Sequence, residues 1–315
     1  MRFSVTKLDQ KVAPLDVGIH ELQKLAQLLG GRLTLRGIVE GTLSGQHRSP
    51  RQGVSLDFAQ HRDYALGDDL RHLDWRAYAK SDRLVVKQYE EETNLRAFFL
   101  LDRSMSMNYQ GGGLSTKGVY GAQLVAALSW TLLNHGEAIG LVTYGAEIDH
   151  YLPASSKQDH FWRIVDALET RPWLPETNSA AALLGLPARL PPKGVIFLVT
   201  DGFDFSAEDE EERSSQLASV ARALKRHGYH VVLLHILDPH ELNFPFDELS
   251  LFEGLEGEAP IKVDPDGVRR AYLEEFSRFR EGVQKDSIAG GVTYYLCPTH
   301  QPLSATLLGL LERVS

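Results

Sequence analysis

The stretch that most constrains the fold is residues 94–107, which read NLRAFFLLDRSMSM. Its apolar residues are Leu95 and the unbroken run from Ala97 to Leu101. A short apolar run is typical of a strand that is covered on both faces, as in a parallel sheet flanked by helices. We therefore expect this stretch to begin with a buried central strand.

Three oxygen-bearing side chains follow the strand in a D-x-S-x-S pattern, namely Asp102, Ser104 and Ser106. Open α/β sheets bind ligands just beyond the carboxyl ends of their strands. A carboxylate and two hydroxyls on one tight turn, completed by waters, suit a small octahedral cation such as Mg²⁺. By itself the pattern is more typical of an ordinary polar turn than of a metal site, because short motifs also occur by chance.

Two further segments fit the same site. Residues 194–202, GVIFLVTDG, read as a second apolar strand that is followed by Asp201. Between the two strands, Thr177 lies in a loop ahead of the helical run AAALLGL. The order strand-DxSxS, loop threonine and strand-TDG resembles a von Willebrand factor A domain with its metal-ion-dependent adhesion site. This resemblance implies a Mg²⁺ site, with Mn²⁺ or Ca²⁺ as alternatives, formed by Asp102, Ser104, Ser106, Thr177 and Asp201.

The rest of residues 94–315 alternates strands with helices. Further strands are expected at 138–145, 229–237 and 291–298, and helices at 117–135, 156–170, 179–189 and 303–313. This alternation predicts an α/β fold with a doubly wound, mainly parallel sheet. Residues 15–29 read as an amphipathic helix that packs on the sheet domain. Residues 238–266 hold nine acidic residues and one lysine, which predicts a solvated insertion or an acidic flap.

A dense polar and aromatic motif lies between the first helix and the central strand. It reads R-x-Y-x-x-G-D-D-x-R-x-L-D-W and contains Arg62, Tyr64, Gly67, Asp68, Asp69, Arg71, Asp74 and Trp75. Its charges could neutralise one another in an ion-pair network that stiffens a substructure without sheet or helix. The alternative is a catalytic carboxylate cluster, because perturbed acids gather at functional sites.

This motif, followed by VKQYEEE and the DxSxS strand, resembles the family known as domain of unknown function 58. Two later elements of that family also have counterparts, D-P-x-E at Asp238–Glu241 and F-x-x-L-E at Phe252–Glu256. The resemblance implies an accessory segment at 1–93 and a von Willebrand A-like domain at 94–315. It also implies a partner class, since relatives are commonly encoded beside AAA+ ATPases of the MoxR type. Longer relatives carry membrane helices ahead of this region, so this chain resembles their short, soluble form.

Charge, apolar runs, cysteine content and motif spacing argue against several other functions. The formal net charge of −9 disfavours nucleic acid as a partner, because an acidic surface repels phosphates. No apolar run of 18 residues and no secretory signal occurs, so we expect no membrane span. The single Cys297 excludes an internal disulfide and favours a cytoplasmic protein. Lys117 follows three glycines but precedes Gly118, which does not match a P-loop.

The leading functional hypothesis is a non-enzymatic, metal-dependent protein-binding module. A glutamate or aspartate from the partner would fill the open coordination position. One alternative is a Mg²⁺-dependent hydrolase that uses Asp102, although Ser104 stands where such an enzyme would need a second carboxylate. The other is a structural or oligomerisation protein with a vacant metal site.

Overall fold

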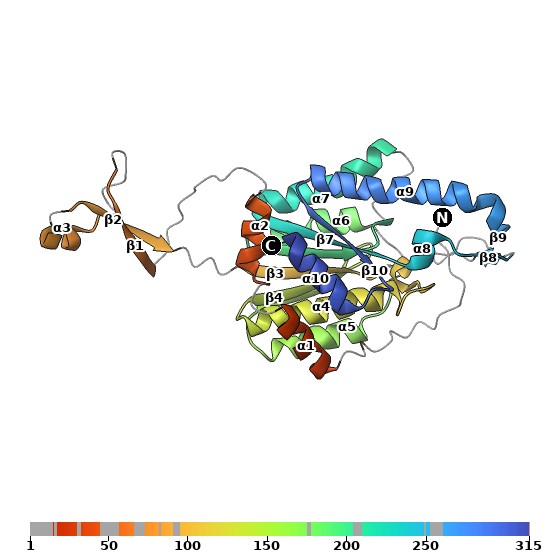
Figure 1. Cartoon of the computed structure of the whole chain (residues 1–315), viewed down its shortest axis with the longest axis horizontal. Helices are drawn as coiled ribbons and strands as arrows, with labels where there is room; N and C mark the ends of the chain where they lie inside the picture. The colour runs from red at the N-terminus through yellow and green to blue at the C-terminus, as the bar shows by residue number, and fades with distance from the viewer. Residues whose placement is uncertain are drawn as a thin grey trace. The chain divides into compact units, whose positions relative to one another are not determined.

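Six strands form the central sheet in the computed structural model (Figure 1). The residues that it describes are 15, 18–29, 33–44, 57–65, 73–81, 83–90, 95–174, 178–203, 210–248, 250–252 and 261–314. The strand order is β10-β7-β6-β3-β4-β5. The strands are β3 (Arg96–Asp102), β4 (Ala138–Tyr144), β5 (Ile148–Ser155), β6 (Gly194–Thr200), β7 (Tyr229–Leu237) and β10 (Thr293–Pro298). Every neighbouring pair is parallel except β4 and β5.

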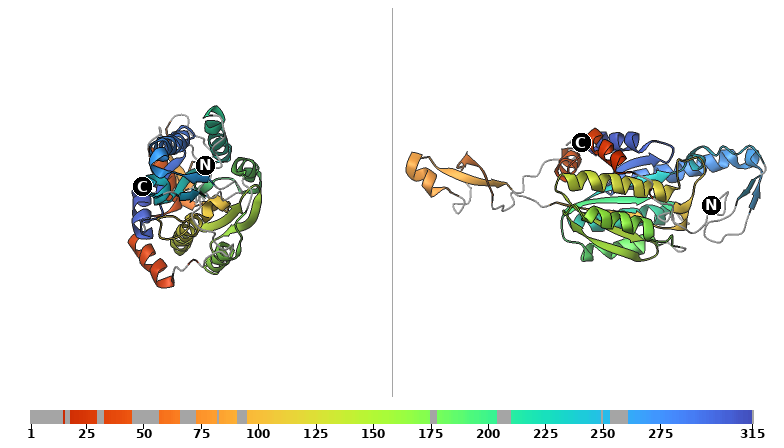
Figure 2. Two further views of the ribbon diagram at one scale, coloured as in Figure 1. Left: turned by 90° about the vertical axis from the view of Figure 1, so that its right-hand side faces the viewer. Right: turned by 90° about the horizontal axis from the view of Figure 1, so that it is seen from below.

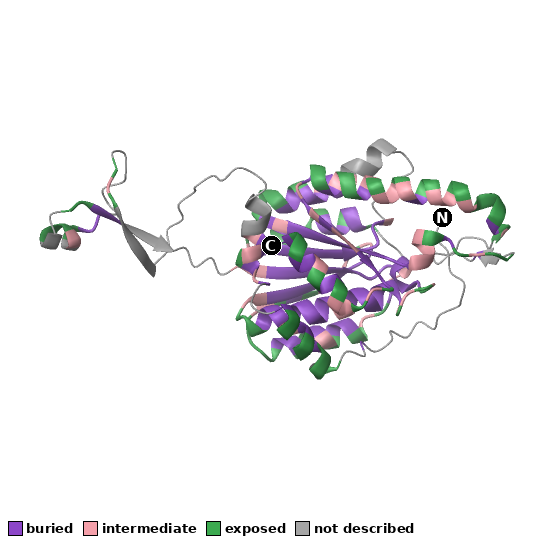
Figure 3. Cartoon of the chain, in the orientation of Figure 1, coloured by how far each residue is buried: buried purple, intermediate pink, exposed green. Residues whose placement is uncertain are grey.

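The apolar run of β3 is buried on both faces of the sheet (Figure 3). Successive strand residues point to opposite faces, and Phe99 and Leu101 accordingly join one apolar core while Phe98 and Leu100 join the other. Buried residues of α4 (Lys117–Asn134), α5 (His160–Thr170) and α10 (Leu303–Val314) complete the first core. Residues of α6 (Ser179–Leu184), α7 (Glu210–Arg226) and α9 (Pro265–Ala289) complete the second. Helices therefore cover both faces (Figure 2), which confirms an α/β fold with a mainly parallel sheet.

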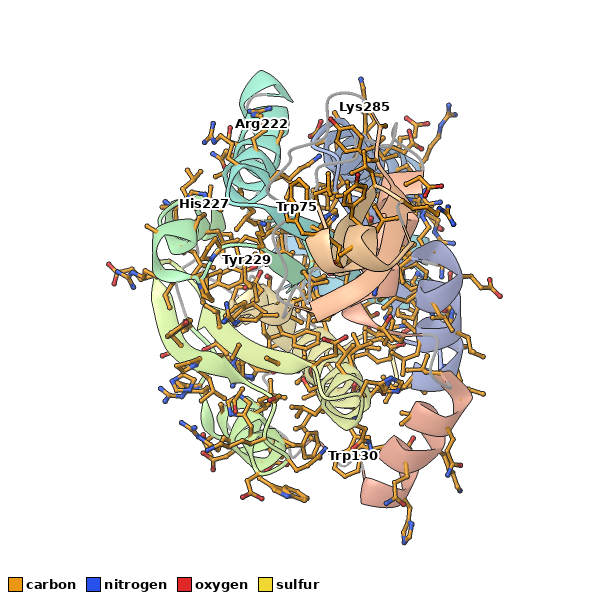
Figure 4. All side chains as sticks on the ribbon, turned by 90° about the vertical axis from the view of Figure 1, so that its left-hand side faces the viewer. Trp75, Trp130, Arg222, His227, Tyr229 and Lys285 are labelled. Atoms are coloured by element: carbon orange, nitrogen blue, oxygen red, sulfur yellow. The ribbon has the colours of Figure 1, made fainter. Side chains whose placement is uncertain are left out.

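The order of the strands reverses beside β3. The chain proceeds from β3 to β4 and β5 on one side, then returns to the other side for β6, β7 and β10. The carboxyl ends of β3 and β6 thus flank the point of reversal, which is where open α/β sheets form a crevice. At the opposite edge of the sheet, Tyr229, which is labelled in Figure 4, begins β7. Its hydroxyl donates a hydrogen bond to the carbonyl oxygen of Pro191.

Two N-terminal helices, α1 (Ile19–Leu29) and α2 (Leu35–Ser44), belong to the same compact unit as the sheet. Their buried residues join the first core, and this set consists of Leu22, Leu25, Leu29, Leu35 and Ile38. The larger unit comprises residues 1–46 and 95–315, and the smaller one residues 47–94. The compact units therefore differ from the expected division into 1–93 and 94–315, because the helices before residue 46 bury their apolar stripes on the sheet unit.

The smaller unit contains regular structure that its sequence does not reveal. Strands β1 (Asp57–Asp63) and β2 (Val85–Glu90) pair in an antiparallel hairpin, and α3 (Trp75–Ser81) lies between them in the chain. The expectation of a substructure without sheet or helix is therefore wrong. Polar residues on both strands, such as Gln60 and Lys87, hide the alternation that predicts a strand.

The acidic insertion also contains regular elements. Helix α8 (Pro239–Asn243) begins it, and β8 (Ser250–Phe252) pairs antiparallel with β9 (Ile261–Val263). Its first acidic residue, Asp238, is completely buried, so the insertion does not start as a solvated loop. Among the residues described, no helix is long and apolar enough to cross a membrane.

Candidate functional site

Two buried aspartates mark the carboxyl ends of the central strands. Asp102 ends β3, and Asp201 follows Thr200 at the end of the neighbouring strand β6. Both aspartates have no exposed surface. The Thr200 hydroxyl donates a hydrogen bond of 2.7 Å to Oδ2 of Asp102, which joins the two strand ends.

The D-x-S-x-S turn folds its three polar side chains together. The Ser104 backbone N–H donates to Oδ1 of Asp102 at 2.9 Å, and the Ser104 and Ser106 hydroxyl oxygens lie 2.8 Å apart. Ser106 lies on a short 3-10 turn, Met105–Asn108, and both serines are buried. Three of the five expected metal ligands therefore form one hydrogen-bonded cluster of hard oxygen donors. Thr177 lies outside the described residues.

Among the described residues, the groups that shift the pKa of Asp102 include no cation. Burial, and then the nearby charge of Asp201, raise the pKa of Asp102 to about 7, against the lowering effect of its hydrogen bonds to Thr200 and Ser104. A cation next to a buried carboxylate favours its ionised form. In the described part of the chain, no three carboxylate, imidazole or thiol side chains converge as metal ligands, so a cation here would depend on hydroxyls and water as well.

Asp201 is already paired with a cation inside the protein. The Lys117 ammonium donates to Oδ2 of Asp201 at 2.8 Å and to Oε1 of Glu241 at 2.6 Å. Lys117 is the first residue of α4 and is 1% exposed. Burial lowers the pKa of Lys117, but the two carboxylates outweigh this effect and raise it above its usual value, so the ammonium stays charged. Lys117 does not match a P-loop lysine, and no sequence motif predicts its pairing with these carboxylates.

The D-P-x-E element brings Glu241 to this lysine. Asp238 caps α8 by accepting from the His240 N–H at 2.8 Å, and Glu241 accepts from the Asp238 N–H at 2.8 Å, which is a capping box. The element thus starts a helix directly after β7 (Figure 1). Because β7 is parallel to β6 and β6 to β3, this helix starts at the same edge of the sheet as the two aspartates. The spacing of aspartate, proline and glutamate in the sequence predicts the start of this helix.

Asp238 also fixes the glycine loop that precedes Lys117. Its carboxylate accepts the backbone N–H groups of Gly111 at 3.0 Å, Gly112 at 2.9 Å and Gly113 at 3.1 Å. A Cβ atom on Gly111 would lie 2.7 Å from the His240 ring, so a side chain there would collide with α8. The glycines therefore let the loop approach Asp238 and do not form a phosphate-binding loop.

The second expected group of residues lies in the smaller unit, where the structure describes only part of it. Gly67, Asp68, Asp69 and Arg71 lie outside the described residues, as does the side chain of Arg62 on β1. Tyr64 is half-buried, and Asp74 is buried and accepts from the Ala77 N–H at 3.1 Å, which caps α3. Trp75 is 62% exposed.

Comparisons with known proteins agree with part of the sequence analysis. The chain is 24% identical over 217 residues to uncharacterized proteins of Mycobacterium tuberculosis and Mycobacterium bovis, which covers 68% of this chain. It spans 65% of the length of those relatives.

Solved structures with a similar chain path include the conserved hypothetical protein BatB from Bacteroides thetaiotaomicron. It is 14% identical with a TM-score of 0.42, and the match covers 70% of this chain and 97% of BatB. The pilus adhesin SpaC from Lactobacillus rhamnosus GG is 13% identical with a TM-score of 0.46, and the match covers 71% of this chain and 30% of the adhesin. The family model described as "Protein of unknown function DUF58" matches residues 60–282. Because this match includes more than half of the sequence, the chain belongs to the DUF58 family.

Proposed function

We propose that this protein is a metal-dependent protein-binding module with a von Willebrand A-like sheet domain. The observation that carries the proposal is the cluster of Asp102, Ser104 and Ser106 at the carboxyl end of β3, beside the point where the strand order reverses. A buried carboxylate with a raised pKa and two adjacent hydroxyls suit a hard cation.

Each residue has a separate role in this proposal. Asp102, Ser104 and Ser106 would hold Mg²⁺ directly or through water, with Mn²⁺ and Ca²⁺ as alternative ions, and Thr177 belongs to the same expected set. Thr200 orients Asp102 through its hydrogen bond. When bound, Mg²⁺ would offer an open coordination position to a carboxylate of the partner. By resemblance to its family, the protein would act as an adaptor or co-chaperone of a MoxR-type AAA+ ATPase in the cytoplasm.

The contacts of Asp102 favour binding over hydrolysis. Each oxygen of Asp102 accepts one hydrogen bond from the chain, which orients the carboxylate and leaves lone pairs for a cation. The imidazole of His235, which contacts Asp201, has its two ring nitrogens engaged with the Asp201 carbonyl oxygen and the Tyr294 hydroxyl. We therefore propose no enzymatic step at this site.

Calorimetric titration with MgCl₂ tests the metal site directly. The wild-type chain is expected to bind Mg²⁺, and both Asp102→Asn and the double variant Ser104→Ala/Ser106→Ala are expected to lose at least about tenfold in affinity, because each removes oxygen ligands. Asp159→Asn is the matched control, since this exposed carboxylate lies at the start of α5, after the antiparallel strand β5.

Binding to a purified MoxR-type AAA+ ATPase tests the partner class. Retention by wild type in Mg²⁺, but not in chelator and not by Asp102→Asn, would support the proposal. Equal retention in all conditions would show that the cluster is not the binding surface. Mg²⁺-dependent turnover of p-nitrophenyl phosphate that Asp102→Asn abolishes would instead support a hydrolase.

A further inference from the structure

The carboxyl edge of the sheet carries four buried or nearly buried carboxylates, those of Asp102, Asp201, Asp238 and Glu241, but only one described ammonium group. Lys117 gives two of its three N–H donors to Asp201 and Glu241. Among the described residues, the groups that shift the pKa of Asp102 are the Asp201 carboxylate, the Thr200 hydroxyl and the Ser104 amide and hydroxyl, and none of them is a cation. The buried guanidinium of Arg103 donates to the carbonyl oxygens of Leu168 and Arg171, and the ammonium of Lys117 is committed to Asp201 and Glu241.

Lys117 is held in a closed environment. Its ammonium lies 4.8 Å from the centre of the Phe203 ring and 5.7 Å from that of Tyr109, and both rings can interact favourably with a cation. Its own backbone N–H donates to the Tyr109 carbonyl oxygen at 2.9 Å. Two carboxylates and two aromatic rings thus surround the ammonium, which keeps it away from water.

The carboxylate partners of Lys117 are also fixed. The other oxygen of Glu241 accepts the Asp238 N–H in the capping box, so the glutamate cannot turn away without breaking the start of α8. Oδ1 of Asp201 accepts the Phe203 N–H at 3.2 Å, and Oδ2 accepts from Lys117. Both oxygens of Asp201 are therefore engaged within the chain.

We propose that Lys117 is a positioning residue for the metal site, which keeps Asp201 out of direct coordination and leaves Asp102 as the carboxylate that holds the ion. This inference rests on the proposed function. Cation sites gain affinity with the number of charged ligands, so a site restrained in this way binds weakly by itself. The second negative charge then comes from the partner's carboxylate, which makes metal binding and partner binding depend on each other.

Releasing Asp201 tests the inference. In the double variant Lys117→Met/Glu241→Gln, one positive and one negative group are removed together, which limits the cost of leaving a buried charge unpaired. Mg²⁺ titration of the full chain is expected to give binding about tenfold tighter or more, because a second carboxylate joins the site. Adding Asp201→Asn to the double variant is expected to remove this gain. Thermal melts in chelator report separately whether each variant is folded.

The control removes a similar pair elsewhere. Arg270 and Glu274 form an exposed ion pair of 2.8 Å on α9, and Arg270→Met/Glu274→Gln is expected to bind Mg²⁺ as wild type does. If Lys117→Met/Glu241→Gln binds Mg²⁺ no more tightly than wild type, the proposed role of Lys117 is overturned. The same holds if the gain in affinity persists after Asp201→Asn. Neither outcome affects the proposed function. Absence of Mg²⁺ binding to wild type overturns the proposed function, and this inference with it.

Discussion

At the residue scale, hydrogen-bond partners fix the protonation state of His235. Its Nε2 lies 2.8 Å from the carbonyl oxygen of Asp201, which can only accept, so Nε2 carries the proton. Nδ1 then accepts from the Tyr294 hydroxyl at 2.9 Å. The ring is neutral, and its Nε2–H group donates a hydrogen bond to the backbone carbonyl of Asp201.

This histidine makes stability depend on pH. Burial lowers the pKa of His235 to about 4, from an unfolded value of 6.5. The unfolded chain therefore takes up a proton below pH 6.5 that the folded protein does not, and the free energy of unfolding falls as the pH falls from 6.5 towards 4. We expect urea denaturation in chelator to show this in the His235→Gln variant. Between pH 7 and pH 5, its free energy of unfolding should fall by about 2 kcal/mol less than that of wild type.

His300→Gln provides the control for this prediction, because His300 is exposed. It should follow the wild-type dependence. A His235→Gln variant with the same pH dependence as wild type would show that the buried ring does not titrate as its contacts imply.

At the element scale, two helices start with the same Asp-Pro pair but differ in what the aspartate holds. Asp264 caps α9 by accepting only from the Asp266 N–H, at 3.3 Å, among the bonds of the described residues. Asp238 caps α8 and in addition holds the three glycine amides and accepts from the Thr299 hydroxyl at 3.3 Å. In the described part of the chain, the same Asp-Pro pair therefore only caps a helix at Asp264, whereas at Asp238 it also holds the glycine loop and Thr299.

Alanine substitution at the two caps should separate these roles. Asp264→Ala is expected to cost about 1 kcal/mol, as for an ordinary N-cap. Asp238→Ala is expected to cost roughly 3–5 kcal/mol, because it leaves several backbone donors without an acceptor. Equal losses in guanidinium denaturation would mean that the glycine loop does not depend on Asp238.

At the scale of the whole molecule, the larger unit is discontinuous in sequence. Residues 1–46 and 95–315 form one compact unit, and residues 47–94 form another. Helices α1 and α2 contribute buried leucines to the core beside α4 and α10. The smaller unit is thus an insertion into the chain of the larger one.

Two deletions test this organisation. Replacing residues 47–94 by a flexible glycine-serine linker should preserve the cooperative thermal unfolding of the sheet unit and its Mg²⁺ binding. Deleting residues 1–46 should cost more than about 5 kcal/mol, because each buried leucine contributes about 1.5–3 kcal/mol. Circular dichroism melts measure the stability of both variants. Loss of cooperative unfolding when residues 47–94 are replaced would contradict the division into units.

The sequence predicts those features whose causes are local. The apolar runs of β3, β6 and β7 indicate buried parallel strands, and D-x-S-x-S brings Asp102, Ser104 and Ser106 together within one turn. Strand β5 was not predicted, because an antiparallel edge strand that mixes polar and apolar residues lacks the apolar run of a central strand. The β1–β2 hairpin was missed for a similar reason.

The sequence by itself therefore determined the α/β class, the ends of the central strands and the serine turn, because each depends on neighbouring residues. Only the tertiary structure decided which groups share the edge of the sheet. Lys117 is 84 residues from Asp201 and 124 from Glu241, and these residues meet because β7, β6 and β3 are adjacent in the sheet and α4 begins at the same edge. Strand order results from packing over the whole chain, so no local pattern could assign the ammonium of Lys117 to these carboxylates.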